Sequence, residues 1–166
     1  MSRAGAPQSQ QIDGSGTQVV IVAGTWHEVI TEGLIAGAQR ALDAAGAEHR
    51  LVRVPGSFEL ALAAQAAFAG GADAVVALGV IIRGGTPHFE YVSHATTDGL
   101  TRAALDAGKP IGFGVLTLDD EQQGLDRAGL AGSKEDKGAE AAEAALRMVA
   151  VIRELAAPAA RDMLGE

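Results

Sequence analysis

The strongest constraint on the fold is an apolar run of nine residues, Ala74 to Ile82, which contains no polar side chain. The run is too short to cross a membrane and has the length of a strand. A strand that is apolar on both faces is typical of a parallel sheet covered by helices on both sides. Three further runs predict the remaining strands, at Val19–Ala23, Leu51–Val54 and Ile111–Leu116, and the second of them is interrupted by Arg53.

Three segments between these runs and one after the last run space their apolar residues as helices do. They cover residues 28–45, 58–68, 89–107 and 135–155. Ser57, Thr86 and Ser133 stand where N-caps are expected, and Pro87 where a helix begins. The alternation predicts a three-layer α/β/α fold with a four-stranded parallel sheet. We expect this domain to span residues 18–157, between a flexible N-terminal arm (1–17) and a C-terminal tail (158–166).

Charge and composition exclude several functions. The formal net charge is −8, so nucleic acid is not an expected partner, and no apolar stretch is long enough to predict a membrane span. The chain has no cysteine, which excludes disulfides, thiolate metal ligands and a cysteine nucleophile. The four histidines lack the spacing of a zinc motif, and no P-loop, dinucleotide-binding or Gly-x-Ser-x-Gly motif is present.

The loops after the strands are the candidate site, because ligands of parallel sheets bind beyond the carboxyl ends of the strands. Trp26 follows the first strand and is either a packing residue or a flat surface for a planar ligand. Glu59 follows the second strand. Its carboxylate either complements a helix dipole or accepts hydrogen bonds from ligand hydroxyls.

The loop after the third strand is the most informative. Gly84 and Gly85 allow close approach of the backbone, and the next helix directs free amides towards the ligand edge, which suits a phosphate. His88 suits proton transfer, although a lone histidine is more often structural. Downstream, Arg127 and Lys137 are either solvated surface cations or the basic groups that a phosphorylated substrate needs.

Five motifs resemble those of the lumazine synthase family, in the same order and spacing. They are Val54-Pro-Gly-Ser-Phe-Glu59, residues 77–92, Gly112-Phe-Gly-Val-Leu-Thr117, Asp126-Arg-Ala-Gly129 and Glu135-Asp-Lys-Gly138. The resemblance covers roughly residues 19–155. It implies a cytoplasmic enzyme with a flavodoxin-like subunit, assembled into a homopentamer or a multiple of one, with active sites between neighbouring subunits.

The resemblance also implies a role for each candidate residue. The pyrimidine and its ribityl chain would be bound by Trp26, Ser57, Phe58, Glu59, Val80, Ile81 and Ile82, with Phe113 of a neighbour closing the pocket. The phosphate would be bound by Gly84, Gly85, Thr86, Arg127 and Lys137. His88 would move protons, and His88 and Arg127 are the expected catalytic residues.

The implied reaction condenses 5-amino-6-(D-ribitylamino)uracil with 3,4-dihydroxy-2-butanone 4-phosphate to 6,7-dimethyl-8-ribityllumazine in riboflavin biosynthesis. It releases phosphate and water and needs no cofactor or metal. A non-catalytic flavin- or lumazine-binding storage protein is the alternative, and a generic phosphate-binding module is a third hypothesis. His88 and Arg127 favour the enzyme, because binding alone needs neither. The turn at residues 132–138 departs from that of the sixty-subunit members of the family, which favours a pentamer over a capsid.

Overall fold

The computed structural model describes residues 11–158. The strands form one parallel sheet in the order β2-β1-β3-β4. Their bounds are β1 Gln18–Ala23, β2 Glu48–Arg53, β3 Ala74–Ile82 and β4 Ile111–Leu118. The second strand therefore begins three residues before its predicted start, and the fourth continues two residues further, because Thr117 and Leu118 still pair with the end of β3.

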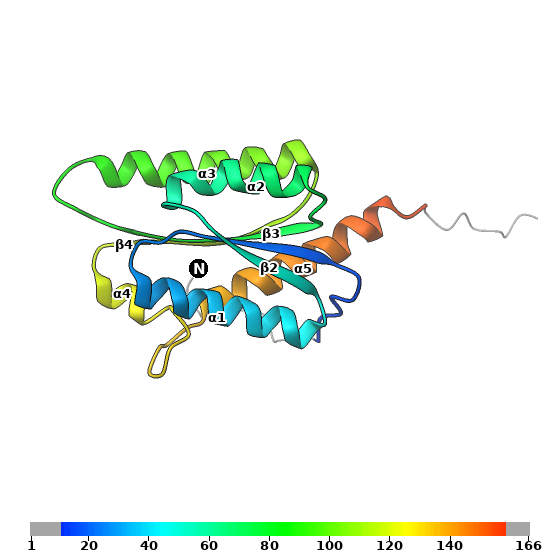
Figure 1. Ribbon diagram of the computed structural model, residues 1–166, viewed down its shortest axis with the longest axis horizontal. Coiled ribbons are helices and arrows are strands. Elements are labelled where there is room, and N and C mark those ends of the chain that lie inside the picture. Colours follow the sequence, from blue (N-terminus) through cyan, green and yellow to red (C-terminus); the bar gives the residue numbers. More distant parts are fainter. Residues whose placement is uncertain (1–10, 159–166) are drawn as a thin grey trace, which may run out of the picture.

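Helices cover both faces of this sheet, which confirms the predicted three layers. Figure 1 shows α1 and α5 on one face and α2 and α3 on the other. Their bounds are α1 Glu28–Ala45, α2 Leu60–Ala69, α3 His88–Ala107 and α5 Lys137–Ala156, with a short α4 at Glu121–Leu125. None of the helices described between residues 11 and 158 has the length and apolar character needed to cross a bilayer.

Strand β3 lies at the centre of the hydrophobic core. Its side chains alternate between two clusters, with Val76 and Leu78 packed on the side of α1 and α5, and Val75 and Ala77 on the side of α2 and α3. All four are fully buried. The absence of polar residues from this run is thus explained by burial on both faces of the sheet.

Helix α5 packs unusually closely because glycines lie at its contacts. A Cβ at Gly138 would overlap the backbone of Leu34 in α1, and a Cβ at Gly112 would overlap the backbone of Ala141. Backbone therefore meets backbone at both places. These contacts fix the start of α5, including Lys137, against α1 and β4.

Two predicted N-caps near the ligand edge are wrong. A 3-10 turn, η1 (Ser57–Glu59), precedes α2, and the Ser57 side chain makes no capping hydrogen bond because it is packed inwards. Helix α3 begins at His88, with Pro87 rather than Thr86 at the cap position and no side-chain cap. Pro87 is therefore not the first helical residue.

The predicted cap of the last helix is also wrong. Asp136 caps α5 by accepting a hydrogen bond from the Ala139 amide at 2.9 Å. The Ser133 hydroxyl instead closes the preceding loop, where it accepts from the Leu130 amide and donates to the Leu125 carbonyl. The helix therefore starts at Lys137, two residues later than predicted.

The segment before β1 lies against the domain where the structure describes it. The Gly14 amide donates to the Ala45 carbonyl at 2.7 Å, Ile12 packs against the core, and Thr17 is buried. The remainder of the predicted arm, residues 1–10, and residues 159–166 of the predicted tail lie outside the described residues.

Candidate active site

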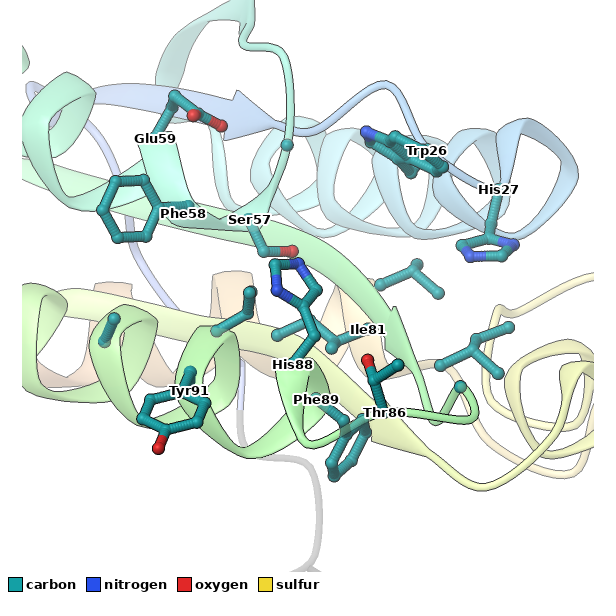
Figure 2. Close-up of a pocket in the computed structure, with 16 residues that line it drawn as sticks. Trp26, His27, Ser57, Phe58, Glu59, Ile81, Thr86, His88, Phe89 and Tyr91 are labelled. Atoms are coloured by element: carbon teal, nitrogen blue, oxygen red, sulfur yellow. The ribbon is translucent and has the colours of Figure 1, made fainter.

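A cavity of about 840 Å³ opens at the carboxyl end of β3, between η1 and the start of α3. Figure 2 shows its walls, with Trp26 and His27 entering from the β1–α1 turn and His88 from the start of α3. Ten of the predicted site residues line it: Trp26, Ser57, Phe58, Glu59, Val80, Ile81, Ile82, Gly84, Thr86 and His88. Residues predicted from three different strand-end loops therefore line one cavity.

Trp26 forms an exposed aromatic wall of this cavity. Its side chain is not in the core, because the residue is 68% exposed. The hydroxyl of buried Thr31 donates a hydrogen bond to the Trp26 carbonyl at 2.7 Å. The indole lies beside Gly56, where a Cβ would come within 3.4 Å of the ring. An exposed ring on an anchored backbone is suited to stack on a planar ligand.

The η1 turn forms the wall opposite α3. Ser57 is anchored from within, because its carbonyl accepts a hydrogen bond from the buried Thr96 hydroxyl at 3.1 Å and its side chain rests on Gly79. Phe58 is 63% exposed. The Glu59 carboxylate makes no hydrogen bond within residues 11–158 and lies beside Gly56. It is thus placed to accept hydrogen bonds from a ligand.

The glycine-rich loop and the start of α3 form the remaining wall. A Cβ at Gly84 or Gly85 would meet nothing within 4 Å, so these glycines are not required by internal packing. Gly84 lines the cavity, while Gly85 is its neighbour on the loop and does not. Because α3 has no side-chain cap, the His88 and Phe89 amides have no partner within residues 11–158 and are free for an anion, whereas the Glu90 amide donates to the Pro87 carbonyl at 3.1 Å. His88 points towards the η1 turn, as Figure 2 shows.

Ion pairs at the back of this loop link it to the sheet. Arg83 follows β3 and binds both Glu90 in the first turn of α3 and Asp119 after β4. The hydrogen bond that Arg83 donates to Glu90, followed by the one it donates to Asp119, raises the pKa of the Arg83 guanidinium, and Arg83 in turn lowers the pKa of the Glu90 carboxyl. Both groups are therefore charged at neutral pH.

Phe113, Arg127 and Lys137 do not line the cavity of their own chain. Phe113 lies on β4 and is 49% exposed. The Arg127 guanidinium donates to the Gln123 carbonyl at 2.8 Å, and the Lys137 amide donates to the Arg127 carbonyl at 2.9 Å. The backbone thus brings the two cations together in a segment separate from the cavity.

Carboxylates surround the ammonium group of Lys137. Its Nζ lies 2.8 Å from Glu135 Oε2 and 2.7 Å from Glu140 Oε2. Burial lowers the pKa of Lys137, but the hydrogen bonds to Glu135 and Glu140 outweigh burial and raise it. The hydrogen bond from Lys137 lowers the pKa of Glu135. Lys137 is therefore a charged group held in place by its neighbours.

Sequence reasoning missed six residues that line the cavity: His27, Gly56, Phe89, Tyr91, Val92 and Ala95. Helical spacing from His88 gives a signal for Tyr91, Val92 and Ala95, which follow it by three, four and seven residues. His27 adopts a left-handed backbone conformation with φ 55°, unusual for a non-glycine residue. No pattern in the sequence indicates that conformation.

No group of three or more His, Asp or Glu side chains converges as metal ligands do, over the part of the chain that the structure describes. The polar groups of the cavity are instead two imidazoles, one carboxylate, three hydroxyls, the Trp26 indole N–H and the backbone amides at the start of α3; the side chains are those of His27, His88, Glu59, Ser57, Thr86 and Tyr91. These groups are suited to bind a planar molecule that carries hydroxyl groups, to bind an anion beside it, and to transfer protons.

Comparison with known proteins agrees with this chemistry. The model of the family 6,7-dimethyl-8-ribityllumazine synthase matches residues 16–153. The chain belongs to this family. A member from Leifsonia xyli subsp. xyli is 71% identical over 156 residues, covering 93% of this chain and 99% of the relative. Members from Clavibacter michiganensis subsp. michiganensis and Streptomyces avermitilis are 66% and 50% identical, covering 93% and 95% of this chain and 98% and 99% of those relatives.

Proposed function

We propose that the chain catalyses the condensation of 5-amino-6-(D-ribitylamino)uracil with 3,4-dihydroxy-2-butanone 4-phosphate to 6,7-dimethyl-8-ribityllumazine, in riboflavin biosynthesis. One observation supports the proposal most directly. An exposed indole, a carboxylate without a hydrogen bond within residues 11–158, an uncapped helix start and an imidazole line a single cavity of about 840 Å³. That volume lies within the ~300–1,000 Å³ typical of small-molecule sites.

The pyrimidine ring stacks on Trp26 in this proposal, and its polar edge meets backbone groups at Val80, Ile81 and Ile82. The ribityl chain runs along η1, where Ser57, Phe58 and the free carboxylate of Glu59 receive its hydroxyls. The lining of the cavity supports this placement, since η1 and the end of β3 both border it. Stacking and hydrogen bonds together orient the reacting amine towards α3.

The phosphate of the second substrate occupies the loop of Gly84, Gly85 and Thr86 at the start of α3. Free amides and the helix dipole favour a dianion there. The ketone then lies near His88, where the amine attacks its carbonyl. His88 moves protons as water and phosphate leave and the ring closes, a contribution of typically ~10²–10⁴-fold. Holding both substrates in one orientation contributes up to ~7–11 kcal/mol.

A second chain completes each site in this proposal. Phe113 of the neighbour covers the pyrimidine, and Arg127 and Lys137 of the neighbour bind the phosphate. Two observations support it: these side chains lie away from the cavity of their own chain, and large apolar side chains on several elements are exposed. These are Val29, Leu62, Leu105, Met148, Val151 and Leu155. Exposed apolar surface marks interaction sites, and we favour a homopentamer acting in the cytoplasm.

Substitution of His88 tests the proposed catalytic role. Formation of the fluorescent lumazine and release of phosphate are followed with both substrates and purified His88→Ala. We expect kcat to fall on the order of 10²-fold with lumazine binding retained, because only proton transfer is removed. His94→Ala is the matched control, since His94 lies on the same helix and does not line the cavity.

Unchanged turnover of His88→Ala would refute the role of His88. If the unsubstituted protein binds lumazine but forms none above the uncatalysed rate, the proposed function itself fails. The protein would then be a storage protein, which uses the same cavity without chemistry.

A further inference from the structure

Arg83 connects three elements behind the glycine-rich loop. Its Nε donates to Asp119 Oδ1 at 3.0 Å, its Nη1 donates to Glu90 Oε1 at 2.5 Å, and its guanidinium lies 4.1 Å from the centre of the Phe89 ring. Its amide also donates to the Leu118 carbonyl at 2.8 Å, which continues the pairing of β3 with β4. One side chain thus binds the first turn of α3 to the ends of two strands.

Little else holds the loop between Arg83 and His88. Gly84 and Gly85 have open space where a Cβ would be, and α3 starts without a side-chain cap. Within the described residues, neither the Thr86 hydroxyl nor the His88 imidazole has a hydrogen-bond partner. The positions of Thr86 and His88 therefore depend on how the two ends of the loop are anchored.

We propose that Arg83 is a positioning residue, which holds the first turn of α3 against the carboxyl ends of β3 and β4 and thereby places His88 and the phosphate-binding loop. Arg83 does not line the cavity, so it acts through these groups rather than on substrate. Phe89, under the guanidinium, does line it. This inference rests on the proposed roles of the loop and of His88.

The geometry requires arginine rather than lysine. Two different nitrogens of the guanidinium reach two carboxylates, while its plane stacks on the Phe89 ring. An ammonium group is a point charge and does not reproduce this arrangement. Arg83→Lys is therefore expected to lose most of the positioning while retaining the charge, which separates positioning from a simple effect of local charge.

The first test compares Arg83→Met with the unsubstituted protein in steady-state assays. We expect kcat/KM for the sugar phosphate to fall on the order of 10-fold, because small displacements of a reacting group are costly. The KM for the pyrimidine substrate should change less than twofold, since Trp26 and η1 do not contact Arg83. Arg102→Met is the matched control, because within residues 11–158 Arg102 forms only an exposed pair with Asp106 further along α3. Equal loss for both substrates would overturn the proposal.

The second test measures Arg83→Met in a His88→Ala background. If Arg83 acts by placing His88, part of its effect on kcat disappears when His88 is already absent. A full, independent loss of kcat in that background would overturn the proposal. This result is distinguishable from failure of the catalytic role of His88, which His88→Ala alone reveals.

Glu90→Gln and Asp119→Asn keep the test informative if Arg83→Met folds poorly. Each removes one carboxylate and leaves Arg83 and the Phe89 contact in place. We expect each to reproduce part of the loss in kcat/KM for the sugar phosphate, with the melting temperature nearly unchanged because both carboxylates are exposed. Wild-type kinetics for both variants would overturn the proposal.

Discussion

Gly79 gives the sharpest prediction about how the sheet shapes the cavity. A Cβ at this position in β3 would lie 2.5 Å from Ser57 Oγ and 3.0 Å from Leu60 Cδ1, whereas ordinary contact begins at 3.4 Å. In Gly79→Ala, the Ser57 Oγ must therefore withdraw by about 0.9 Å (3.4 − 2.5), while the Ser57 Cβ at 3.3 Å is only slightly crowded. Leu60 is fully buried and cannot yield freely, and the Thr96 hydroxyl holds the Ser57 backbone.

The expected cost follows from this overlap. Overpacking of a core typically lowers the free energy of unfolding by ~1–3 kcal/mol. Replacing glycine with alanine raises it by ~0.4–1 kcal/mol, because alanine reduces the conformational entropy of the unfolded chain. We expect a net loss of about 1–2 kcal/mol in the free energy of unfolding, or roughly 2–8 °C in Tm at this chain length. Urea and thermal denaturation at matched protein concentration measure it. The KM for the pyrimidine substrate should rise, because the Ser57 hydroxyl is displaced in the cavity wall.

A second substitution isolates the cause. Ser57→Ala removes the overlapping hydroxyl and leaves a Cβ contact at 3.3 Å, so Gly79→Ala should cost at least about 1 kcal/mol less in that background. Gly70→Ala is the control, since its nearest contacts would be 3.4 Å and 3.5 Å and its φ is −80°. Equal costs of Gly79→Ala in both backgrounds would refute the reasoning.

Two further predictions concern the segment that carries Arg127 and Lys137. Asp136→Ala removes both the cap of α5 and the ion pair with Arg40, so the free energy of unfolding should fall by about 1 kcal/mol or more. Asp136→Asn should lose less, because asparagine retains part of the cap. If urea denaturation shows no loss of stability for Asp136→Ala, the prediction is wrong. Lys137 lowers the pKa of Glu135 below its ordinary 4.5, so this carboxylate contributes stability that is complete above about pH 4.5 and is lost as the pH falls through its folded pKa. The urea midpoint should therefore drop below that pH, and less steeply in Glu135→Gln; identical slopes would exclude the pair as a cause.

Much of the fold was predictable because burial on both faces leaves a clear pattern. The run from Ala74 to Ile82 indicated a parallel strand buried on both faces, and the order of strands and helices indicated three layers. The caps were less predictable, since Ser133 and Asp136 both fit before α5. Contacts made only after folding decided between them, because the Lys134 and Glu135 amides bind the Asp126 carbonyl and leave Asp136 at the helix start.

The residues of the site that directly follow strands were predictable. Those placed by an unusual backbone conformation, or lying away from the cavity, were not predictable from strand positions. Trp26, Glu59 and His88 follow strands whose carboxyl ends share one edge of the sheet, so their convergence follows from topology. His27 enters the cavity through a left-handed backbone that has no sequence signature. Phe113, Arg127 and Lys137 were assigned from motifs and stay predictions, because they do not line the cavity of their own chain and the proposed site needs them from a neighbour.

The claim that two chains complete each site is tested most directly by mixing inactive variants. His88→Ala and Arg127→Ala are each prepared alone and then co-assembled in equal amounts. In a ring of subunits, random mixing restores an intact pair of His88 and Arg127 at about one interface in four. We predict that the mixture forms lumazine at about a quarter of the unsubstituted rate, far above either variant alone. A rate equal to the mean of the two variants would contradict the claim and would place Arg127 outside the site.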